Sequence, residues 1–207
     1  MTVPEAPNAN GGRIALRDAE LRYRPGWLPA ARADTLFDAL LAQVPWEIHR
    51  IRLFGREVDS PRLSCWMGDA DATYRYSGVR HAPRPWLPAL DEVRERLYRE
   101  AGIGFNSVLL NRYRDGRDAM GWHSDDEAEL GPEPVIASLS LGATRRFVLK
   151  HRGEPSCRLA LELEHGSLLL MSRATQRNYR HALPRTAKAV GERINLTFRR
   201  IIAPARG

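Results

Sequence analysis

The stretch that decides the fold is Arg193-Ile194-Asn195-Leu196-Thr197-Phe198-Arg199, in which polar and apolar residues alternate. Such alternation predicts a β-strand with its apolar side chains on one face and its polar side chains on the other. On an edge strand the polar face would be solvent-exposed, whereas in a closed barrel it would line the interior. Arg193 and Arg199 would lie roughly 20 Å apart on the extended strand, and their side chains can lean together. Guanidinium groups placed in this way can hold the two ends of a small dicarboxylate.

The same period of two runs through the second half of the chain. Segments bounded by Gly, Pro or charged turns predict short strands at 107–113, 134–141, 145–150, 157–164, 166–171, 178–183 and 193–201. We expect two helices before them, one at 34–44 with Asp34 as its N-cap and one from Pro88 to Gly102. These elements indicate a mainly β fold with flanking helices, a barrel or jelly roll whose core occupies about residues 105–203.

Length and composition indicate a single globular domain. The chain has 207 residues, of which 43% are hydrophobic and 28% charged, and these values exclude global disorder. Residues 1–12 are expected to be a disordered leader and residues 13–207 the domain. No apolar run reaches the roughly 20 residues that a membrane-spanning helix needs, so no membrane partner is expected. Two cysteines, Cys65 and Cys157, form no CxxC pattern, which favours a reducing cytoplasm.

The basic charge has two interpretations. Lys and Arg number 32 against 25 acidic residues, a formal net charge of +7, and all the basic residues except Lys150 and Lys188 are Arg. Nucleic acid is one explanation, since guanidinium groups pair bidentately with phosphate. A genome rich in G and C would produce the same excess of Arg without any function. Arg145 and Arg146 show the ambiguity, because each can be a phosphate contact or ordinary solvated surface.

A second group of residues suggests metal chemistry. His123 and Asp125 stand two residues apart, and His181 follows 56 residues after Asp125. Two imidazoles and one carboxylate form a facial triad that suits non-haem Fe(II), although an isolated HxD is common in ordinary turns. A zinc-dependent cupin-type enzyme would use the same ligands but would leave Arg193 and Arg199 unexplained. No P-loop, dinucleotide-binding glycine pattern or GxSxG motif occurs in the sequence.

These residues together resemble the AlkB family of Fe(II)- and 2-oxoglutarate-dependent dioxygenases. The family pattern stands here, in order, as Asn111/Tyr113, His123/Asp125, His181 and the stretch 193–199. The resemblance spans roughly residues 50–201 and implies a double-stranded β-helix. It also implies that His123, Asp125 and His181 hold Fe(II). It further implies that 2-oxoglutarate is bound by Asn111, Tyr113, Arg193, Asn195 and Arg199, with O2 as the second co-substrate.

The duplex-acting DNA repair branch of the family shows the greatest similarity, and it implies roles for residues outside this pattern. Residues 46–86 would form a nucleotide-recognition lid, because a base inside a duplex must be flipped out before an enzyme can modify it. In that lid Tyr76 would stack on the flipped base and Tyr74 would contact its backbone or edge. Glu127 would read the exocyclic amino group of the base, or be an exposed turn residue. Phe54 would be an intercalating finger, or a core residue before a turn.

The resemblance implies an oxidative demethylase that repairs 1-methyladenine- or 3-methylcytosine-type lesions in DNA. Such an enzyme couples 2-oxoglutarate decarboxylation to methyl hydroxylation and formaldehyde release. One alternative is the same chemistry on RNA or on a protein side chain. Another is a non-catalytic nucleic-acid-binding module, against which the complete triad and arginine strand argue. A monomer in the cytoplasm is expected.

Overall fold

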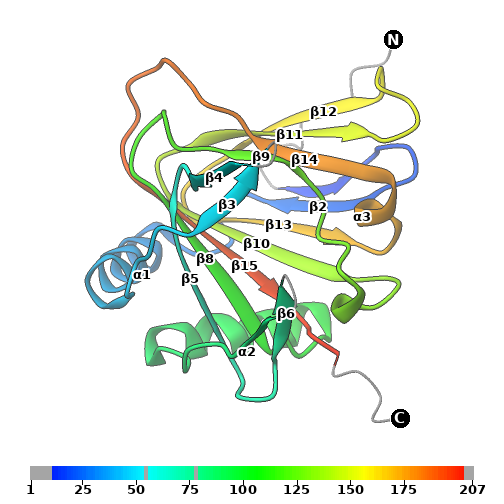
Figure 1. The fold of residues 1–207 in the computed structure, drawn as a ribbon. Coiled ribbons are helices and arrows are strands. Elements are labelled where there is room, and N and C mark those ends of the chain that lie inside the picture. Colours follow the sequence, from blue (N-terminus) through cyan, green and yellow to red (C-terminus); the bar gives the residue numbers. More distant parts are fainter. Residues whose placement is uncertain (1–10, 54–55, 77–78, 203–207) are drawn as a thin grey trace, which may run out of the picture.

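The computed structural model describes residues 11–53, 56–76 and 79–202 and contains two main β-sheets (Figure 1). The strands are β1 Gly12–Ile14, β2 Glu20–Arg24, β3 Arg50–Leu53, β4 Arg56–Asp59, β5 Leu63–Gly68, β6 Tyr74–Tyr76, β7 Val79–His81, β8 Ser107–Tyr113, β9 Met120–His123, β10 Val135–Gly142, β11 Arg145–His151, β12 Arg158–Leu163, β13 Ser167–Ser172, β14 Tyr179–Leu183 and β15 Arg193–Arg199. The α-helices are α1 Ala30–Gln43, α2 Asp91–Ala101 and α3 Ala174–Asn178, and short 3₁₀ turns cover Pro88–Leu90 and Ala128–Leu130. The leader expected at 1–12 lies outside the described residues except for its last two positions, and Gly12 begins β1.

The large sheet has the strand order β1-β2-β13-β10-β15-β8-β5, and the small sheet has the order β12-β11-β14-β9. All the pairs in both sheets are antiparallel. The two sheets face each other across an interior, as a jelly roll requires, so the expected fold class is confirmed (Figure 1). Two further pairs, β3 with β4 and β6 with β7, form separate two-stranded sheets.

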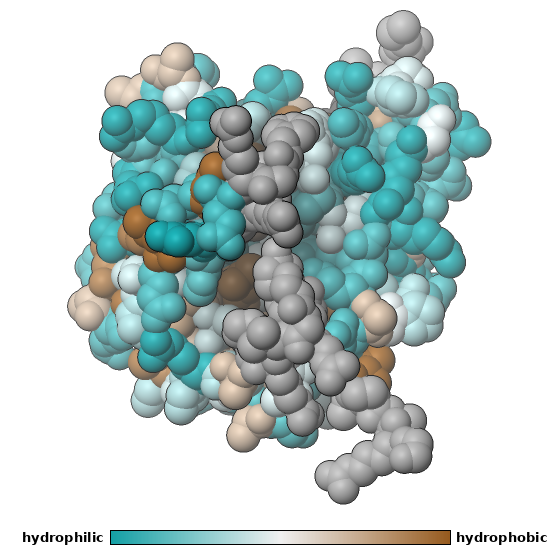
Figure 2. Space-filling model, viewed as in Figure 1, coloured by the Kyte–Doolittle hydropathy of each residue, from teal (hydrophilic) through white to brown (hydrophobic). Residues whose placement is uncertain are grey.

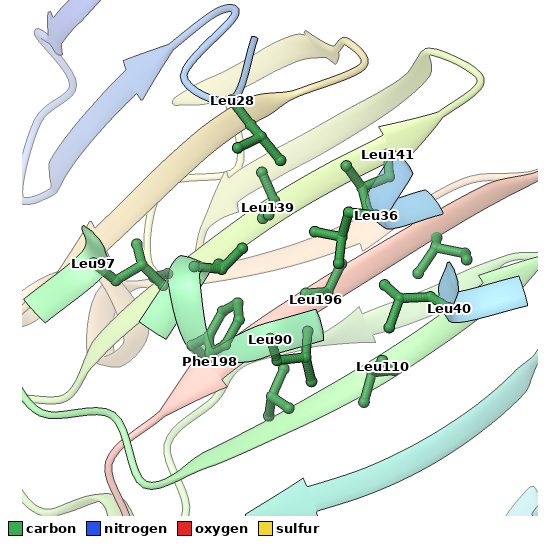
Figure 3. Close-up of a cluster of buried hydrophobic side chains, with 14 of the residues drawn as sticks. Leu28, Leu36, Leu40, Leu90, Leu97, Leu110, Leu139, Leu141, Leu196 and Phe198 are labelled. Atoms are coloured by element: carbon green, nitrogen blue, oxygen red, sulfur yellow. The ribbon is translucent and has the colours of Figure 1, made fainter. Parts of the chain in front are cut away.

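The strand β15 lies between β10 and β8, in the interior of the large sheet. The edge-strand interpretation of its polar row is therefore wrong. Its apolar residues Ile194, Leu196 and Phe198 are fully buried on the outer face, where α1 and α2 cover the sheet (Figure 3). At roughly 25 cal/mol per Å², each buried side chain of this size contributes about 2 kcal/mol. The polar row consequently faces the barrel interior.

Both expected helices are present, but the first begins earlier than predicted. The apolar stripe Leu36, Leu40 and Val44 is buried against the large sheet, as the periodicity predicts. The helix begins at Ala30, because the carbonyl of Pro29 accepts the first hydrogen bonds, from the amides of Arg32 and Ala33 at 2.9 Å. Asp34 therefore lies inside the helix, and its assignment as the N-cap is wrong.

Strands from the first part of the chain extend the large sheet beyond the expected core of 105–203. The strand β2 pairs with β13 and β5 pairs with β8. Cys65 and Met67 on β5 belong to the buried core under the helices. Part of the segment 46–86 is therefore a strand of the barrel, and only the remainder is available for a lid. The other expected strands, from Ser107 onward, appear within a residue or two of their predicted bounds.

None of the helices in the described part of the chain has the length and apolar character that a membrane crossing requires.

Candidate active site

A pocket lies between the two sheets, on the polar face of β15. Its walls come from β8, β9, β10, β11, β13, β14 and β15 and from the residues that follow β9. All eight residues that the sequence suggested for metal and co-substrate line this pocket. They are Asn111, Tyr113, His123, Asp125, His181, Arg193, Asn195 and Arg199. The structure therefore brings together residues that span 89 positions of sequence, 199 minus 110, because four neighbouring strands and one turn carry them.

His123, Asp125 and His181 form a compact group of three donors. One ligand atom from each lies within 4.8 Å of the others, and no other such group of three or more occurs among the described residues. The Nε2 atom of His181 is 3.5 Å from Oδ2 of Asp125, and the two imidazole ring centroids are 4.2 Å apart. This proximity follows from the register, since His123 on β9 lies opposite His181 on β14.

The protonation states of His181 and Asp125 suit a divalent cation. Burial lowers the pKa of His181 to about 3, with the neighbouring His123 contributing, so its imidazole is neutral at pH 7. Burial alone would raise the pKa of Asp125, but the Arg199 guanidinium and the two imidazoles outweigh that effect and lower it. The Nδ1 atom of His123 lies 2.8 Å from the carbonyl oxygen of Gly121, which favours a proton on Nδ1 and leaves Nε2 as the donor atom.

Hydrogen bonds from buried neighbours hold the segment that carries Asp125. The backbone amide of Asp125 donates to Oε1 of Gln176 at 3.0 Å, and the Ser124 hydroxyl donates to the carbonyl of Tyr179 at 2.7 Å. Gln176 is 1% exposed and lies on the short helix α3. Sequence reasoning did not identify Gln176, because α3 has only five residues and shows no readable periodicity.

The other end of the pocket is built around Arg193, which is 1% exposed. Its Nη2 atom donates to the Ser140 hydroxyl at 2.9 Å and to Oδ1 of Asn195 at 2.7 Å. Burial lowers the pKa of Arg193 to about 10, although it remains charged at pH 7. No carboxylate forms an ion pair with Arg193 among the described residues, and its Nε atom is buried without a hydrogen-bond partner. A buried cation without a carboxylate partner favours an anionic ligand.

Arg62 is a second residue that sequence reasoning missed. It precedes β5, and its Nε atom donates to Oδ1 of Asn111 at 2.8 Å. Since the amide oxygen of Asn111 is occupied, the amide nitrogen is the group that can donate into the pocket. Arg62 is half-buried, and burial lowers its pKa. A search for alternating polar residues could not find it, because Arg62 stands alone after Ser60-Pro61.

The donor set fits Fe(II) and a dicarboxylate. Two imidazole nitrogens and one carboxylate oxygen form the facial set that leaves further coordination positions open. Arg193 and Arg199 provide positive charge at the two ends of the same pocket wall. A purely zinc-binding interpretation would not account for these two arginines.

Of four further residues suggested by the sequence, only Glu127 has a described side chain, and it is not among the described residues that line the pocket. Glu127 is half-buried just after Asp125, and burial raises its pKa although Arg199 opposes that effect. Tyr74 and Tyr76 are the end residues of β6, which pairs with β7, but their side chains lie outside the described residues. Phe54 also lies outside the described residues.

The fold and this pocket are those of one enzyme superfamily. Residues 20–199 match the model of the 2OG-Fe(II) oxygenase superfamily, so the chain belongs to that superfamily. The matched region contains the small sheet, all strands of the large sheet except β1, and every residue of the pocket.

Comparison with curated proteins narrows the assignment to the AlkB family. The chain is 43% identical over 182 residues to the human DNA oxidative demethylase ALKBH2, covering 83% of this chain and 70% of the human protein. It is 40% identical over 195 residues to the alpha-ketoglutarate-dependent dioxygenase alkB homolog 3 of Rattus norvegicus, covering 88% of this chain and 64% of the rat protein. The Arabidopsis thaliana DNA oxidative demethylase ALKBH2 is 40% identical over 210 residues, covering 89% and 67% of the two chains.

A solved structure of OsALKBH1 has the same fold. It superimposes with a TM-score of 0.62 at 15% sequence identity and covers 87% of this chain and 97% of that chain. At this identity the similarity establishes the fold alone.

Proposed function

We propose that the protein is an oxidative demethylase of N-alkylated nucleobases in DNA, of the 1-methyladenine and 3-methylcytosine type. The observation that carries this proposal is one pocket with a three-donor group at one end and, at the other, a buried arginine that forms no ion pair with a carboxylate of the described residues. The names of the human and Arabidopsis relatives support DNA as the substrate.

Each end of the pocket has a separate task in this proposal. His123, Asp125 and His181 would hold Fe(II), and Arg193 and Arg199 would bind the carboxylates of 2-oxoglutarate. Asn111, Tyr113 and Asn195 would fix the co-substrate between them. Bound Fe(II), 2-oxoglutarate and O2 supply the oxidation that converts the methyl group to formaldehyde and 2-oxoglutarate to succinate and carbon dioxide. Met120, Phe147 and Leu183 line the pocket and would exclude water.

A cationic row on the outer face of the small sheet supports a nucleic-acid substrate. Lys150 on β11 lies directly opposite Arg158 on β12 and Arg180 on β14. Like charges opposite one another destabilise a sheet, and none of the ion pairs within the described residues includes these three cations. They line a hollow of about 410 Å³ that also contains His151 and Arg152. The described part of the face drawn in Figure 2 is largely hydrophilic.

An exposed tryptophan continues this row toward the metal site. Trp122 is 45% exposed on β9, and the Nζ atom of Lys150 lies 4.2 Å from its ring centroid. It immediately precedes His123, so the cationic row and the donor group are carried by neighbouring residues. Cations combined with an exposed aromatic ring suit a nucleic acid, since phosphates pair with the cations and a base can stack on the ring.

The base-recognition roles of Tyr74, Tyr76 and Glu127 and the finger role of Phe54 remain part of this proposal. An apolar wedge replaces the stacking that a flipped base loses, which is worth a few kcal/mol per step. The variant Phe54→Ala should therefore reduce repair of duplex substrate more than repair of single-stranded substrate. Equal losses on both substrates would remove the finger role.

Mass spectrometry of methylated oligonucleotides tests the proposal directly. The protein is incubated with single-stranded DNA, duplex DNA and RNA that carry 1-methyladenine or 3-methylcytosine, with Fe(II), 2-oxoglutarate and ascorbate. Demethylation lowers the oligonucleotide mass by about 14 mass units per lesion, the mass of one methylene group. We expect this loss on DNA only when both Fe(II) and 2-oxoglutarate are present. Demethylation of RNA alone would move the substrate to RNA. If all three nucleic acids keep their methyl groups and succinate is released only when a protein fraction is added, the substrate would instead be a protein side chain.

We also propose that the protein works as a monomer in the cytoplasm. Cys65 and Cys157 are free thiols, and Cys65 is buried, which suits a reducing compartment. Light scattering of the purified protein tests the oligomeric state, and a mass near twice 23.4 kDa would overturn the monomer.

A further inference from the structure

Arg145 and Arg146 are neighbours in sequence with different environments. Both were candidates for phosphate contacts, but Arg145 is 2% exposed whereas Arg146 is exposed. Arg145 begins β11 just after the tight turn at Gly142, which has a φ of +80°. A Cβ at Gly142 would lie 2.4 Å from the Glu192 carbonyl oxygen, so this turn requires glycine. Side chains alternate along β11, so Arg145 lies on the buried face with Phe147 and Leu149 whereas Arg146 lies on the exposed face. Arg145 is therefore not a surface phosphate contact.

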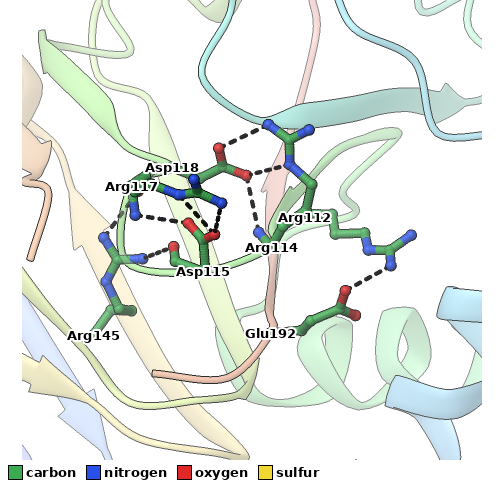
Figure 4. Close-up of polar contacts among 7 residues, drawn as sticks. All are labelled: Arg112, Arg114, Asp115, Arg117, Asp118, Arg145 and Glu192. Carbon is green, nitrogen blue, oxygen red and sulfur yellow. Dashed lines mark hydrogen bonds and ion pairs between the residues drawn. The ribbon is translucent and has the colours of Figure 1, made fainter. Parts of the chain in front are cut away.

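The Arg145 guanidinium holds three backbone carbonyls. It donates to the carbonyl of Asp115 at 3.0 Å and to that of Asp118 at 2.9 Å, both in the turn between β8 and β9 (Figure 4). It also donates to the carbonyl of Pro184, just after β14, at 2.8 Å. One side chain of the small sheet therefore ties together the ends of the strands that carry Tyr113 and His181.

The positive charge of Arg145 has no carboxylate partner among the described residues. The two nearest acids in the turn are already engaged, since Asp115 pairs with Arg117 and Asp118 with Arg114 (Figure 4). Burial lowers the pKa of Arg145, yet a guanidinium stays charged at pH 7. Arg145 and Arg193 are therefore two buried cations that form no ion pair with an acidic side chain of the described residues.

Tyr113 lies between these two cations. The Cζ atom of Arg193 is 5.2 Å from the Tyr113 ring centroid, and the Cζ atom of Arg145 is 5.9 Å from it. Tyr113 is 3% exposed and lines the pocket, and it lies opposite Arg193 in the register of β8 and β15. Arg145 does not line the pocket itself, so any effect on a ligand passes through Tyr113 or through its charge.

We propose that Arg145 is a positioning residue for the co-substrate carboxylate at the Arg193 end of the pocket. It fixes the Tyr113 ring and adds a second buried positive charge, so that this end selects a dicarboxylate over a monocarboxylate. The inference rests on the proposed function, because it takes 2-oxoglutarate as the ligand of Tyr113 and Arg193. Burying two positive charges near each other lowers the stability of the folded protein, and a bound carboxylate offsets this unfavourable free energy.

Isothermal titration calorimetry with Mn(II) in place of Fe(II) tests this role without turnover. Mn(II) is titrated first, followed by 2-oxoglutarate or by 2-oxopentanoate, which has the same carbon chain length but no second carboxylate. The variants are Arg145→Gln and Arg145→Lys, with Arg146→Gln as the matched control on the same strand. Circular dichroism melts of every variant accompany the titrations.

Arg145→Gln should weaken 2-oxoglutarate binding roughly tenfold, the size expected when one buried charge near a ligand charge is removed. Binding of Mn(II) and of 2-oxopentanoate should stay within about twofold of the unaltered protein, because neither has a carboxylate at the Arg193 end. Arg145→Lys should recover part of the loss, since it keeps the charge but not the three-carbonyl fork. Arg146→Gln should change nothing.

Equal 2-oxoglutarate affinity in Arg145→Gln and the unaltered protein would overturn the inference. Parallel losses of Mn(II), 2-oxoglutarate and 2-oxopentanoate binding would also overturn it, because they would indicate general damage to the fold. If Arg145→Gln does not fold, Arg145→Lys decides, and unchanged 2-oxoglutarate affinity in that variant counts against the role. An unaltered protein that binds no 2-oxoglutarate would instead contradict the proposed function.

Discussion

Arg199 donates a hydrogen bond from Nη2 to Oδ1 of Asp125, a residue 74 positions earlier in the chain. The other carboxylate oxygen of Asp125, Oδ2, lies 3.5 Å from Nε2 of His181. One carboxylate therefore connects the donor group to the arginine strand. Arg193, at the other end of the same strand, has no such link, since its Nη2 atom donates to the uncharged side chains of Ser140 and Asn195. The two arginines should consequently differ in what their loss affects.

Replacing Arg199 with Ala should weaken both metal and co-substrate binding, whereas Arg193→Ala should weaken co-substrate binding alone. Removing a hydrogen-bonding partner of a ligating carboxylate typically costs 10–100-fold in metal affinity, so about that loss is expected for Arg199→Ala. Titration with Mn(II) and then 2-oxoglutarate measures both affinities. Unchanged Mn(II) affinity in Arg199→Ala would show that Asp125 is held without Arg199.

Replacing His123 with Ala should abolish stoichiometric metal binding and leave the protein folded. The His123 side chain is only half-buried, so its loss leaves no large cavity, and two of the three donors are too few for tight binding. Metal content after dialysis and the circular dichroism spectrum give the two readouts. The matched control is His49→Ala, because His49 is exposed and outside the pocket. One bound metal per chain in His123→Ala would remove the metal assignment.

Neutralising the cationic row should weaken nucleic-acid binding uniformly across sequences. The double variant Lys150→Gln/Arg180→Gln removes two cations and should reduce the slope of log affinity against log salt by about two. Fluorescence anisotropy with a labelled oligonucleotide over a salt series measures this slope. Arg146→Gln serves as the control, because Arg146 lies on the same strand but opposite Glu162. A slope equal to that of the unaltered protein would exclude this surface as a phosphate contact.

Replacing Asp118 with Asn should lower stability at pH 7 but not in acid. Asp118 is 4% exposed and accepts bonds from the Arg114 backbone and guanidinium, at 2.8 to 2.9 Å. Burial alone would raise the pKa of Asp118, but these bonds outweigh it and lower the pKa. Because the pKa of Asp118 is lower in the folded protein, ionised Asp118 stabilises the folded protein fully at pH values above its unfolded-state pKa of about 3.9. This stabilisation is lost as the pH falls through the pKa that Asp118 has in the folded protein.

Thermal melts at a series of pH values test this expectation. The loss in Asp118→Asn should be about 1–3 kcal/mol at pH 7 and should shrink below pH 4. Asp115→Asn is the control, because its partner Arg117 is exposed and such surface pairs contribute little. A stability difference that is constant with pH would mean that Asp118 acts through its shape and not through its charge.

The sequence predicted the pocket well because most of its residues lie on strands of period two. Alternation through 193–199 placed Arg193 and Asn195 on one face, and the same rule placed Asn111 with Tyr113. The fold class could also be predicted, because apolar residues on the opposite face of the strands require a layer of helices to bury them. The roles of these residues toward metal and co-substrate stay predictions.

The parts that could not be predicted depend on tertiary contacts that leave no local pattern. Gln176 reaches Asp125 from a five-residue helix, and Arg62 reaches Asn111 from a turn. The alternation of β11 places Arg145 and Arg146 on opposite faces, but nothing in the sequence indicates that backbone carbonyls of distant turns hold the buried Arg145. Asp34 had the right chemistry for an N-cap, but Pro29 had already begun the helix one turn earlier.

The pairing of β2 with β13 has a practical consequence for fragments of this protein. The strand β2 covers the edge of Leu168-Leu169-Leu170-Met171, four apolar residues that precede the end of β13. A fragment that begins after residue 25 would retain every pocket residue yet leave this apolar edge open. Open edges of this kind template pairing between chains, so such a fragment should form aggregates. The strands β1 and β2 thus keep the protein soluble, although they contribute no side chain to the pocket.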